Sequence, residues 1–266
     1  MQKIKPFLKY VGGKRWTYKI ENLFPKNIND YHEPFLGSGS IYFYLKANNI
    51  INGNSYLSDL NPDLIDTFNS VKNNLTEVTS MLQTIDHTIE NYNLYAKSKF
   101  EDETKIAIRY IFLNRYSYGG MYRVNKRGQF NVPYGNRSYK EKFDFKGIEF
   151  CSNLLNSNTF ISKCDFKFSE FNLMQNDFIC LDPPYTGKIK VFDRYNNTKF
   201  GNLDEEKIIQ IVKKTTNENA KFLLFAGDNQ ELAEKIGNMG DILYLDRMNN
   251  LGNKLNQKVE IIVKNY

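Results

Sequence analysis

The stretch FICLDPPYTG, residues 178–187, changes character abruptly in its middle. Residues 178–181 form a short apolar run, which is typical of a buried strand. An acid, two prolines and a tyrosine follow at once, and proline cannot continue a sheet because it lacks a backbone donor and has a fixed φ angle. The pattern predicts a strand that ends in a rigid loop carrying the carboxylate of Asp182 and the ring of Tyr185.

Patterns typical of strands and helices alternate on both sides of this stretch. We expect a strand within residues 29–36, a glycine turn at 37–39, a helix over 40–49 and a second strand at 55–59. Downstream we expect a helix over 203–214, a strand at 221–227, a helix over 229–237, and strands at 241–245 and 258–264. Such alternation predicts an α/β fold built on a doubly wound sheet.

A segment at about residues 65–150 interrupts this alternation. Apolar positions follow helical spacing over 63–100, and residues 106–116 form an apolar, helix-like run. Residues 121–132 are typical of a β-hairpin, with asparagine and glycine in the turn. We therefore predict an inserted, mainly helical subdomain containing a β-hairpin at 65–150, and one larger domain formed by residues 1–64 and 151–266.

The composition is that of a globular protein without a disulfide framework. The chain has 266 residues, 41% of them apolar, which is enough to bury a full core. With three cysteines, two histidines and no Cys-x-x-Cys spacing, we predict no metal site. No apolar stretch reaches membrane-spanning length, and the first residues lack the apolar core of a signal peptide. We expect a cytoplasmic protein that contacts no membrane; the sequence leaves its oligomeric state open, a monomer included.

The charge distribution points to a nucleic-acid partner. The net charge is +6, and no Asp or Glu occurs from Thr104 to Lys140. That window holds eight basic residues interleaved with eight aromatic ones. Basic side chains neutralise phosphates, and planar rings can stack on bases or wedge between them. The alternative is a solvated basic face over a small aromatic core; the length and the interleaving favour nucleic-acid binding.

Polar residues and glycines follow three of the expected strands. In a doubly wound sheet, ligands bind at the carboxyl ends of strands, near the point where strand order reverses. Glycines at 37 and 39 permit a tight turn, and Asp59 follows twenty positions after Gly39, where a carboxylate can accept both hydroxyls of a ribose. This pattern favours an adenosine-containing cofactor over an ordinary turn. It is not the dinucleotide fingerprint, because Tyr42 stands where the third glycine would be.

The Asp-Pro-Pro-Tyr loop suits the exocyclic amine of an aromatic base. Such a nitrogen is a poor nucleophile because its lone pair is delocalised into the ring. The carboxylate of Asp182 and the carbonyl of Pro183 can both accept from the amine, and the prolines hold these acceptors in place. The ring of Tyr185 offers a stacking face for a base extruded from the duplex. The alternative is a proline turn capped by an aspartate.

These motifs together resemble the DNA adenine-N6 methyltransferases of the Dam/DpnM type, the α-class amino-methyltransferases that use S-adenosylmethionine. The resemblance spans nearly the whole chain in the family's order. It rests on FLKYVGGK (7–14), EPFLGSGS (33–40), LSDLN (57–61), NRYSYGGMYRVNKRGQFNVPYG (114–135), CDF (164–166), DPPY (182–185) and VEIIVKNY (259–266). It implies a Rossmann-like methyltransferase sheet with an inserted DNA-recognition subdomain.

The resemblance also implies the roles of individual residues. Catalytic roles fall to Asp182 and the Pro183 carbonyl, which hold the target amine, to Tyr185, which stacks on the base, and to Lys14. The implied cofactor-binding residues are Tyr10, Lys14, Pro34, Phe35, Gly37, Gly39, Asp59, Asp165, Phe166 and Asp182. Within that set, Asp59 would bind the ribose, Asp165 and Phe166 the adenine ring, and the residues from Pro34 to Gly39 the methionine moiety.

In the recognition segment, the resemblance implies DNA contacts by Tyr118, Met121, Arg123, Asn125, Arg127, Pro133 and Arg137. Arg123 suits a bidentate contact with a guanine edge, and Tyr118 is placed to wedge into the base stack. The commonest site in this family is GATC. Gly119 and Met121 replace an Asn and a Leu of the enteric Dam pattern, which leaves bases other than the first G open. No nuclease motif is visible, so a restriction-modification partner is neither inferred nor excluded.

The prediction is a site-specific methyltransferase that acts on adenine N6 in double-stranded DNA. Three alternatives stay open: a Rossmann-type oxidoreductase, a non-catalytic nucleic-acid-binding protein on the same fold, and a methyltransferase for cytosine N4 or RNA adenine. The missing third glycine and the DPPY loop argue against the oxidoreductase. Intact Lys14, Asp59 and DPPY argue against the non-catalytic protein, because binding alone needs none of them.

Overall fold

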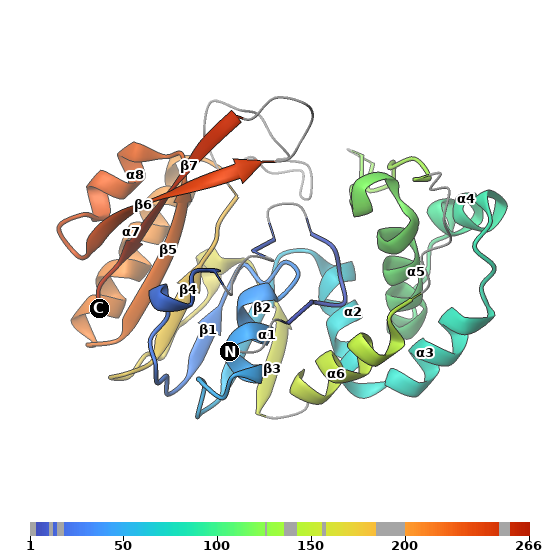
Figure 1. Cartoon of the computed structure of the whole chain (residues 1–266), viewed down its shortest axis with the longest axis horizontal. Helices are drawn as coiled ribbons and strands as arrows, with labels where there is room; N and C mark the ends of the chain where they lie inside the picture. Colours follow the sequence, from blue (N-terminus) through green and yellow to red (C-terminus); the bar gives the residue numbers. More distant parts are fainter. Residues whose placement is uncertain are drawn as a thin grey trace.

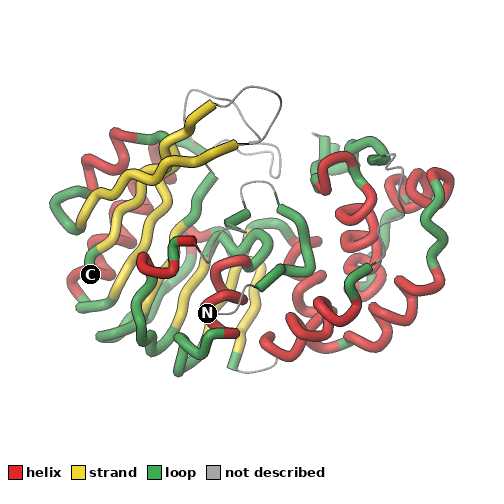
Figure 2. The backbone as a smooth tube through the Cα atoms, in the orientation of Figure 1, coloured by secondary structure: helices red, strands yellow, loops and turns green. Residues whose placement is uncertain are grey.

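The described part of the chain contains one seven-stranded sheet flanked by helices (Figures 1 and 2). The computed structural model describes residues 4–10, 13–14, 19–125, 127–135, 143–155, 158–184, 200–249 and 256–266. The strand order is β3-β2-β1-β4-β5-β7-β6. The strands are β1 (Tyr31–Glu33), β2 (Ser55–Asp59), β3 (Thr159–Lys163), β4 (Phe178–Leu181), β5 (Lys221–Gly227), β6 (Asp241–Asn249) and β7 (Asn256–Lys264).

Strand order reverses between β1 and β4. Strand β1 pairs in parallel with β2 on one side, where Tyr31 lies opposite Ser55, and with β4 on the other, where it lies opposite Phe178. β3 and β5 extend the parallel sheet outward, and β7 and β6 close the β5 edge with antiparallel pairing. The carboxyl ends of β1 and β4 are therefore neighbours, which is where this class of sheet binds ligands.

Both faces of the sheet are covered, as a doubly wound fold requires. Along β4, Phe178 and Cys180 belong to one apolar cluster and Ile179 and Leu181 to another, because successive strand residues point to opposite faces. Helices α7 (Asn202–Asn217) and α8 (Gln230–Ile236) cover the second face. Helices α1 (Ser40–Ala47), α2 (Pro62–Asn73) and α6 (Phe145–Leu155) cover the first. The predicted fold class is confirmed.

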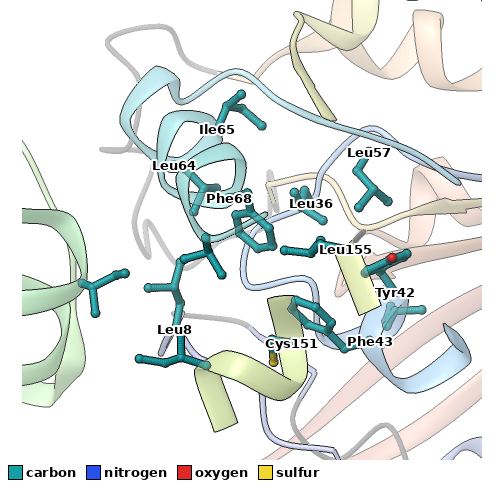
Figure 3. Packing of buried hydrophobic residues seen from close by; sticks show 14 of the residues in the cluster. Leu8, Leu36, Tyr42, Phe43, Leu57, Leu64, Ile65, Phe68, Cys151 and Leu155 are labelled. Carbon is teal, nitrogen blue, oxygen red and sulfur yellow. The ribbon is translucent and has the colours of Figure 1, made fainter. Parts of the chain in front are cut away.

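Aromatic and aliphatic side chains join these three helices beneath the glycine turn. Phe43 of α1 stacks on Phe68 of α2 with ring centroids 6.1 Å apart, and Leu155 of α6 packs beside them (Figure 3). A Cβ added at Gly39 would lie 3.1 Å from the ring of Phe43 and 3.3 Å from that of Phe68. Because Gly39 has no side chain, the turn lies in direct contact with these rings, and the packed core fixes the position of the turn.

A helical lobe lies beyond the β3 edge of the sheet (Figure 1). It contains α3 (Leu75–Thr84), α4 (Ile89–Lys97) and α5 (Glu103–Tyr116), so the helical spacing predicted over 63–100 corresponds to α2, α3 and α4. The side chains of Thr88 and Asp102 accept from backbone N–H groups at the starts of α4 and α5. Leu82 and Tyr92 belong to the same apolar cluster as Tyr42 of α1. The lobe thus shares a core with the sheet.

Most aromatic residues of the acid-free window lie in this shared core. Five of the eight are buried: Tyr110, Phe112, Tyr116, Tyr122 and Phe130. The basic residue Arg109 is buried too, and its guanidinium donates to the carbonyls of Tyr95 and Ala96 and to the hydroxyl of Tyr122. For the five aromatic residues the small aromatic core was the correct interpretation and an exposed stacking surface was wrong. The burial of Arg109 fits neither a solvated basic face nor a phosphate contact. Tyr118 differs, because its side chain is 63% exposed.

The predicted hairpin at 121–132 is present as a turn with a single bridge. Val124 and Phe130 form an isolated antiparallel bridge, and Gly128 adopts a φ of +72°. The side-chain oxygen of Asn125 accepts from the backbone of Arg127 and of Gln129 across the turn. No strand is formed among the described residues of this segment. Side-chain packing holds it, with Tyr122 and Phe130 in the core and Tyr92 donating to the carbonyl of Val132.

Two elements were not predicted, the helix α6 and the edge strand β3 that follows it. In β3 only Thr159 is buried, and Phe160 is 56% exposed, so the strand shows no clear alternation. None of the helices in the described residues combines the length and the apolar character of a membrane span.

Candidate active site

Four neighbouring strands bring the predicted site residues to one edge of the sheet. Asp165 and Phe166 follow β3, Asp59 ends β2, the glycine turn follows β1, and Asp182 follows β4. Because β3, β2, β1 and β4 are adjacent and parallel, these residues lie in a row at their carboxyl ends. Backbone hydrogen bonds join the row: Leu36 N–H donates to Ser58 O and Cys164 N–H donates to Asp59 O.

The glycine turn is closely packed against the N-terminal motif. Gly37 and Gly39 have φ angles of +49° and +67°, which residues with a Cβ rarely adopt. The ring of Tyr10 lies on Gly37, 3.2 Å from where a Cβ would be, and a Cβ at Gly13 would lie 3.0 Å from the Ser38 hydroxyl oxygen. The positive φ angles of Gly37 and Gly39 therefore favour glycine at both positions, in agreement with the motif. Pro34, just before the turn, is buried, and Phe35 is half-buried.

Asp59 is held by the backbone of the same turn. One carboxylate oxygen accepts from Gly37 N–H at 3.0 Å and the other from Asn61 N–H at 3.0 Å. Burial raises the pKa of Asp59, and the N–H donors of Asn61, Gly37 and Leu60 oppose that rise. The hydrogen bonds fix the carboxylate in place and leave it some acceptor capacity for a ligand.

An aromatic corner adjoins Asp59. The ring centroids of Phe35 and Phe166 lie 4.8 Å apart, and Phe200 stacks on Phe166 with a centroid distance of 5.9 Å. Asp165 accepts from the backbone N–H of Lys167, which fixes the turn that carries Phe166. Phe166 is buried in the second apolar cluster, so packing accounts for much of its burial.

Lys14 and Asp182 form the ionic centre of the site. The Lys14 ammonium donates to both oxygens of Asp182, at 2.7 Å each, and lies 4.5 Å above the ring of Phe225. Lys14 is 2% exposed, whereas the Asp182 side chain keeps 22% exposure. Pro183 is buried and Pro184 exposed. The Asp182 carboxylate is thus held on a stiff loop, is neutralised by Lys14 and stays partly exposed to solvent. A carboxylate in this position can accept a hydrogen bond from a ligand amine. Tyr185 lies outside the described residues.

Glu33, at the end of β1, is a buried acid next to this centre. It is 3% exposed and accepts a hydrogen bond of 3.0 Å from the Tyr31 hydroxyl. Burial raises the pKa of Glu33 to about 8, and the charges of Asp182 and Asp59 add to the rise. Glu33 is therefore protonated at neutral pH, so it adds no negative charge beside Asp182 and Asp59.

Comparison with known proteins identifies the class of protein that carries this site. The chain matches the family model of the D12 class N6 adenine-specific DNA methyltransferases over residues 10–251. The chain belongs to this family. It is 30% identical to the Type II methyltransferase M.MjaIII of Methanocaldococcus jannaschii, across 99% of each chain. It is 29% identical both to the Type II methyltransferase M1.LlaDCHI of Lactococcus lactis subsp. cremoris (99% and 96% covered) and to the DNA adenine methylase of Haemophilus influenzae (89% and 84%).

The methyltransferase is thus an enzyme for DNA adenine methylation, as predicted, and the oxidoreductase alternative is wrong. Its family implies a methyl-donating cofactor. Among the residues that the structure describes, no group of His, Cys, Asp and Glu side chains could hold a metal ion.

The methyltransferase presents its predicted recognition residues at the end of α5 and in the turn that follows. Tyr118 and Pro133 are exposed, Met121 and Arg123 are half-buried, and Arg127 is exposed. Arg137 lies outside the described residues. Asn125 uses its side chain within the turn, as described above.

Two further residues shape this recognition surface and were not predicted. Arg123 Nε donates to the side-chain oxygen of Asn131 at 2.8 Å and Arg123 Nη2 donates to the Asn131 carbonyl at 3.3 Å, so Asn131 orients the guanidinium. Asn114, 2% exposed, accepts from Lys9 N–H and donates to the carbonyls of Lys9 and Gly120. Both lie in or beside the quoted recognition motif, but their partners depend on the tertiary fold and no sequence pattern indicates them.

Proposed function

We propose that the enzyme transfers a methyl group from S-adenosylmethionine to N6 of an adenine that is extruded from duplex DNA, within a GATC site. The observation that supports it best is the row of ligand-binding groups at the carboxyl ends of four parallel strands. In the order β3, β2, β1, β4, the row offers an aromatic corner, a carboxylate, a glycine turn and a second carboxylate. This order matches the adenine, ribose and methionine parts of the cofactor, followed by the target amine.

The residues at the site fit S-adenosylmethionine. Asp59 keeps acceptor capacity for a ribose hydroxyl, because its backbone donors do not occupy every lone pair of the carboxylate. Phe166, which packs against Phe35, supplies an apolar face for an adenine ring, with Asp165 beside it. The turn at Gly37 and Gly39 allows close approach of a ligand to the backbone. When bound, the cofactor would supply an electrophilic methyl group.

Asp182 is the group suited to the target amine. Its partial exposure leaves a side on which a base can approach, and the carbonyl of Pro183 provides a second acceptor on the same stiff loop. Two acceptors on one amino group favour the tetrahedral nitrogen that attacks a methyl group. Tyr185, next in sequence, would stack on the base.

The recognition segment within residues 65–150 would contact the DNA. Tyr118 has the exposure that a wedging aromatic residue needs. Arg123, oriented by Asn131, has a guanidinium that suits the O6 and N7 edge of a guanine, in keeping with a G before the target adenine. The Lys14–Asp182 pair and the recognition turn are joined through the N-terminal segment, since Asn114 hydrogen bonds to Lys9.

Replacing Asp182 with alanine tests the chemistry. We expect methyl transfer to be lost, while the affinity for S-adenosylmethionine stays within about tenfold, because the lost acceptor acts mainly on the target amine. Tritium transfer from labelled cofactor and calorimetry measure the two quantities. The matched control is Asp241→Ala, at an exposed position that starts β6. Near-normal turnover in Asp182→Ala would refute the assigned role.

A further inference from the structure

Lys14 has a second acidic neighbour, Glu260 of β7. Its ammonium lies 3.4 Å from Glu260 Oε1, in addition to its two contacts of 2.7 Å with Asp182. Glu260 is 1% exposed and Lys14 is 2% exposed. A carboxylate buried this deeply in a terminal strand is unusual, since acidic residues are rarely buried unless they are paired.

The position of Glu260 in strand β7 directs its side chain toward the active site. On β7, Ile262 belongs to the first apolar cluster and Ile261 to the second, so Glu260 points to the first face together with Ile262. Phe225 of the neighbouring strand β5 lies opposite Ile262 and belongs to the same cluster. The Lys14 ammonium sits above the Phe225 ring, with Asp182 and Glu260 both within ion-pair distance.

In this arrangement Lys14 occupies both oxygens of Asp182. An ammonium bound to both oxygens draws electron density from them and lies close to where a target amine must donate, so the carboxylate is a weaker acceptor. Moving the buried Lys14 ammonium away from Asp182 costs it two short contacts with a carboxylate, which is unfavourable unless another anion compensates for them. Glu260 can provide this compensation, because a short movement of the Lys14 side chain brings its ammonium closer to the Glu260 carboxylate, which is already 3.4 Å away.

We propose that Glu260 is a positioning residue that receives Lys14 when the target adenine enters, which frees one oxygen of Asp182 to accept from the base amine. This inference rests on the proposed function, in which Asp182 holds the amine. The arrangement in this structure, with Lys14 at 2.7 Å from both Asp182 oxygens and 3.4 Å from Glu260, is then the resting one, and in the base-bound arrangement Lys14 lies closer to Glu260 than to Asp182. Glu33 does not compete for the ammonium, because burial raises its pKa to about 8 and leaves it neutral.

The test combines Glu260→Gln, which keeps the shape and removes the charge, with Lys14→Met. Base entry is followed without chemistry by the fluorescence of 2-aminopurine at the target position of a duplex, and catalysis by kcat and KM for DNA. In Glu260→Gln we expect base occupancy and kcat/KM to fall about 10- to 100-fold, the scale of a hydrogen bond to a charged group. In the Lys14→Met background Asp182 is no longer masked, so Glu260→Gln should change base occupancy by less than about twofold.

The proposal would be overturned if Glu260→Gln lowered base occupancy by the same factor in the wild type and in Lys14→Met. A carboxylate with a purely structural role would have that effect, because its contribution would not depend on Lys14. Unchanged base occupancy in Glu260→Gln alone would overturn it too. Circular dichroism checks folding. If Glu260→Gln does not fold, Glu260→Asp keeps the charge but draws it back by one methylene, and must show a smaller loss that again depends on Lys14. Glu206→Gln, at an exposed position of α7, is the matched control.

The outcomes also separate this inference from the proposed function. If Asp182→Ala retains methyl transfer, the assignment of Asp182 is wrong whatever Glu260 does. If Asp182→Ala is inactive while the Lys14 and Glu260 effects are additive, only the movement of Lys14 is wrong.

Discussion

Replacing Glu33 with glutamine should remove a pH dependence from the stability of the fold. Glu33 is 3% exposed at the end of β1, and its carboxyl accepts from the Tyr31 hydroxyl. Burial raises the pKa of Glu33 from 4.5 to about 8; the hydrogen bonds from Tyr31 and Tyr42 oppose this rise, and the nearby charges of Asp182 and Asp59 add to it. Glutamine has nearly the same shape and does not titrate.

The sign and size of the effect follow from linkage. The unfolded chain releases the Glu33 proton near pH 4.5, but the folded protein holds it until about pH 8. Between these values the folded state binds more protons, so the free energy of unfolding falls as pH rises, and above about pH 8 the loss is complete. Each pKa unit corresponds to 1.36 kcal/mol, so the loss between pH 5 and pH 8 is about 3–4 kcal/mol.

Urea denaturation of the cofactor-free protein at several pH values measures this loss. The free energy of unfolding of the wild type should decline relative to that of Glu33→Gln by about 3–4 kcal/mol across the window. A constant offset from an imperfect fit of the amide does not matter, because only the slope is compared. The control Glu206→Gln should keep the wild-type slope. Parallel curves for wild type and Glu33→Gln would mean that Glu33 is ionised in the folded protein, and the assignment of a neutral acid beside Asp182 would be wrong.

Two further predictions concern the ligands. Asp59→Ala should weaken cofactor binding by about 1.5–3 kcal/mol, the range for hydrogen bonds to a charged group, as measured by calorimetry; unchanged affinity would mean that the ribose lies elsewhere. Arg123→Ala should cost about 1–3 kcal/mol on the correct site and broaden methylation at the base before the adenine, measured on a DNA library randomised around a central adenine. A uniform loss of rate over all sequences would reassign Arg123 to phosphate contact.

The parts of the fold that the sequence predicts are those with strong local patterns. Strands β2 and β5 match the predicted ranges, because β5 is an apolar run that ends at a glycine and β2 is bounded by turn residues on both sides. The row of site residues was also predictable, since parallel strands place their carboxyl ends on one edge whatever the details of packing. This rule needs only the strand ends, which the motifs mark.

The parts that were missed depend on contacts between distant segments. Strand β3 is an edge strand with one buried residue, so it lacks the alternation that identifies a strand. The buried aromatic residues of the acid-free window read equally well as a core or as a stacking surface, and only packing against α4 and the recognition turn decides between them. Likewise Arg109 looks like a phosphate ligand in sequence, yet carbonyls of α4 and the Tyr122 hydroxyl occupy it.

The N-terminal segment links recognition to chemistry in a way that neither motif reveals alone. Lys9 is held by Asn114, whose amide also binds the carbonyl of Gly120 in the recognition turn. Gly120 has no room for a side chain there, because a Cβ would lie 2.5 Å from Lys9 Cδ. The next residue, Tyr10, covers the glycine turn at Gly37, and Lys14 binds Asp182. The described residues of the N-terminal motif thus contact three places: Lys9 the turn that follows α5, Tyr10 the glycine turn, and Lys14 the carboxylate of Asp182. In the proposed function, the segment that contacts DNA and the carboxylate that holds the target amine are therefore both bound by residues of the same N-terminal motif.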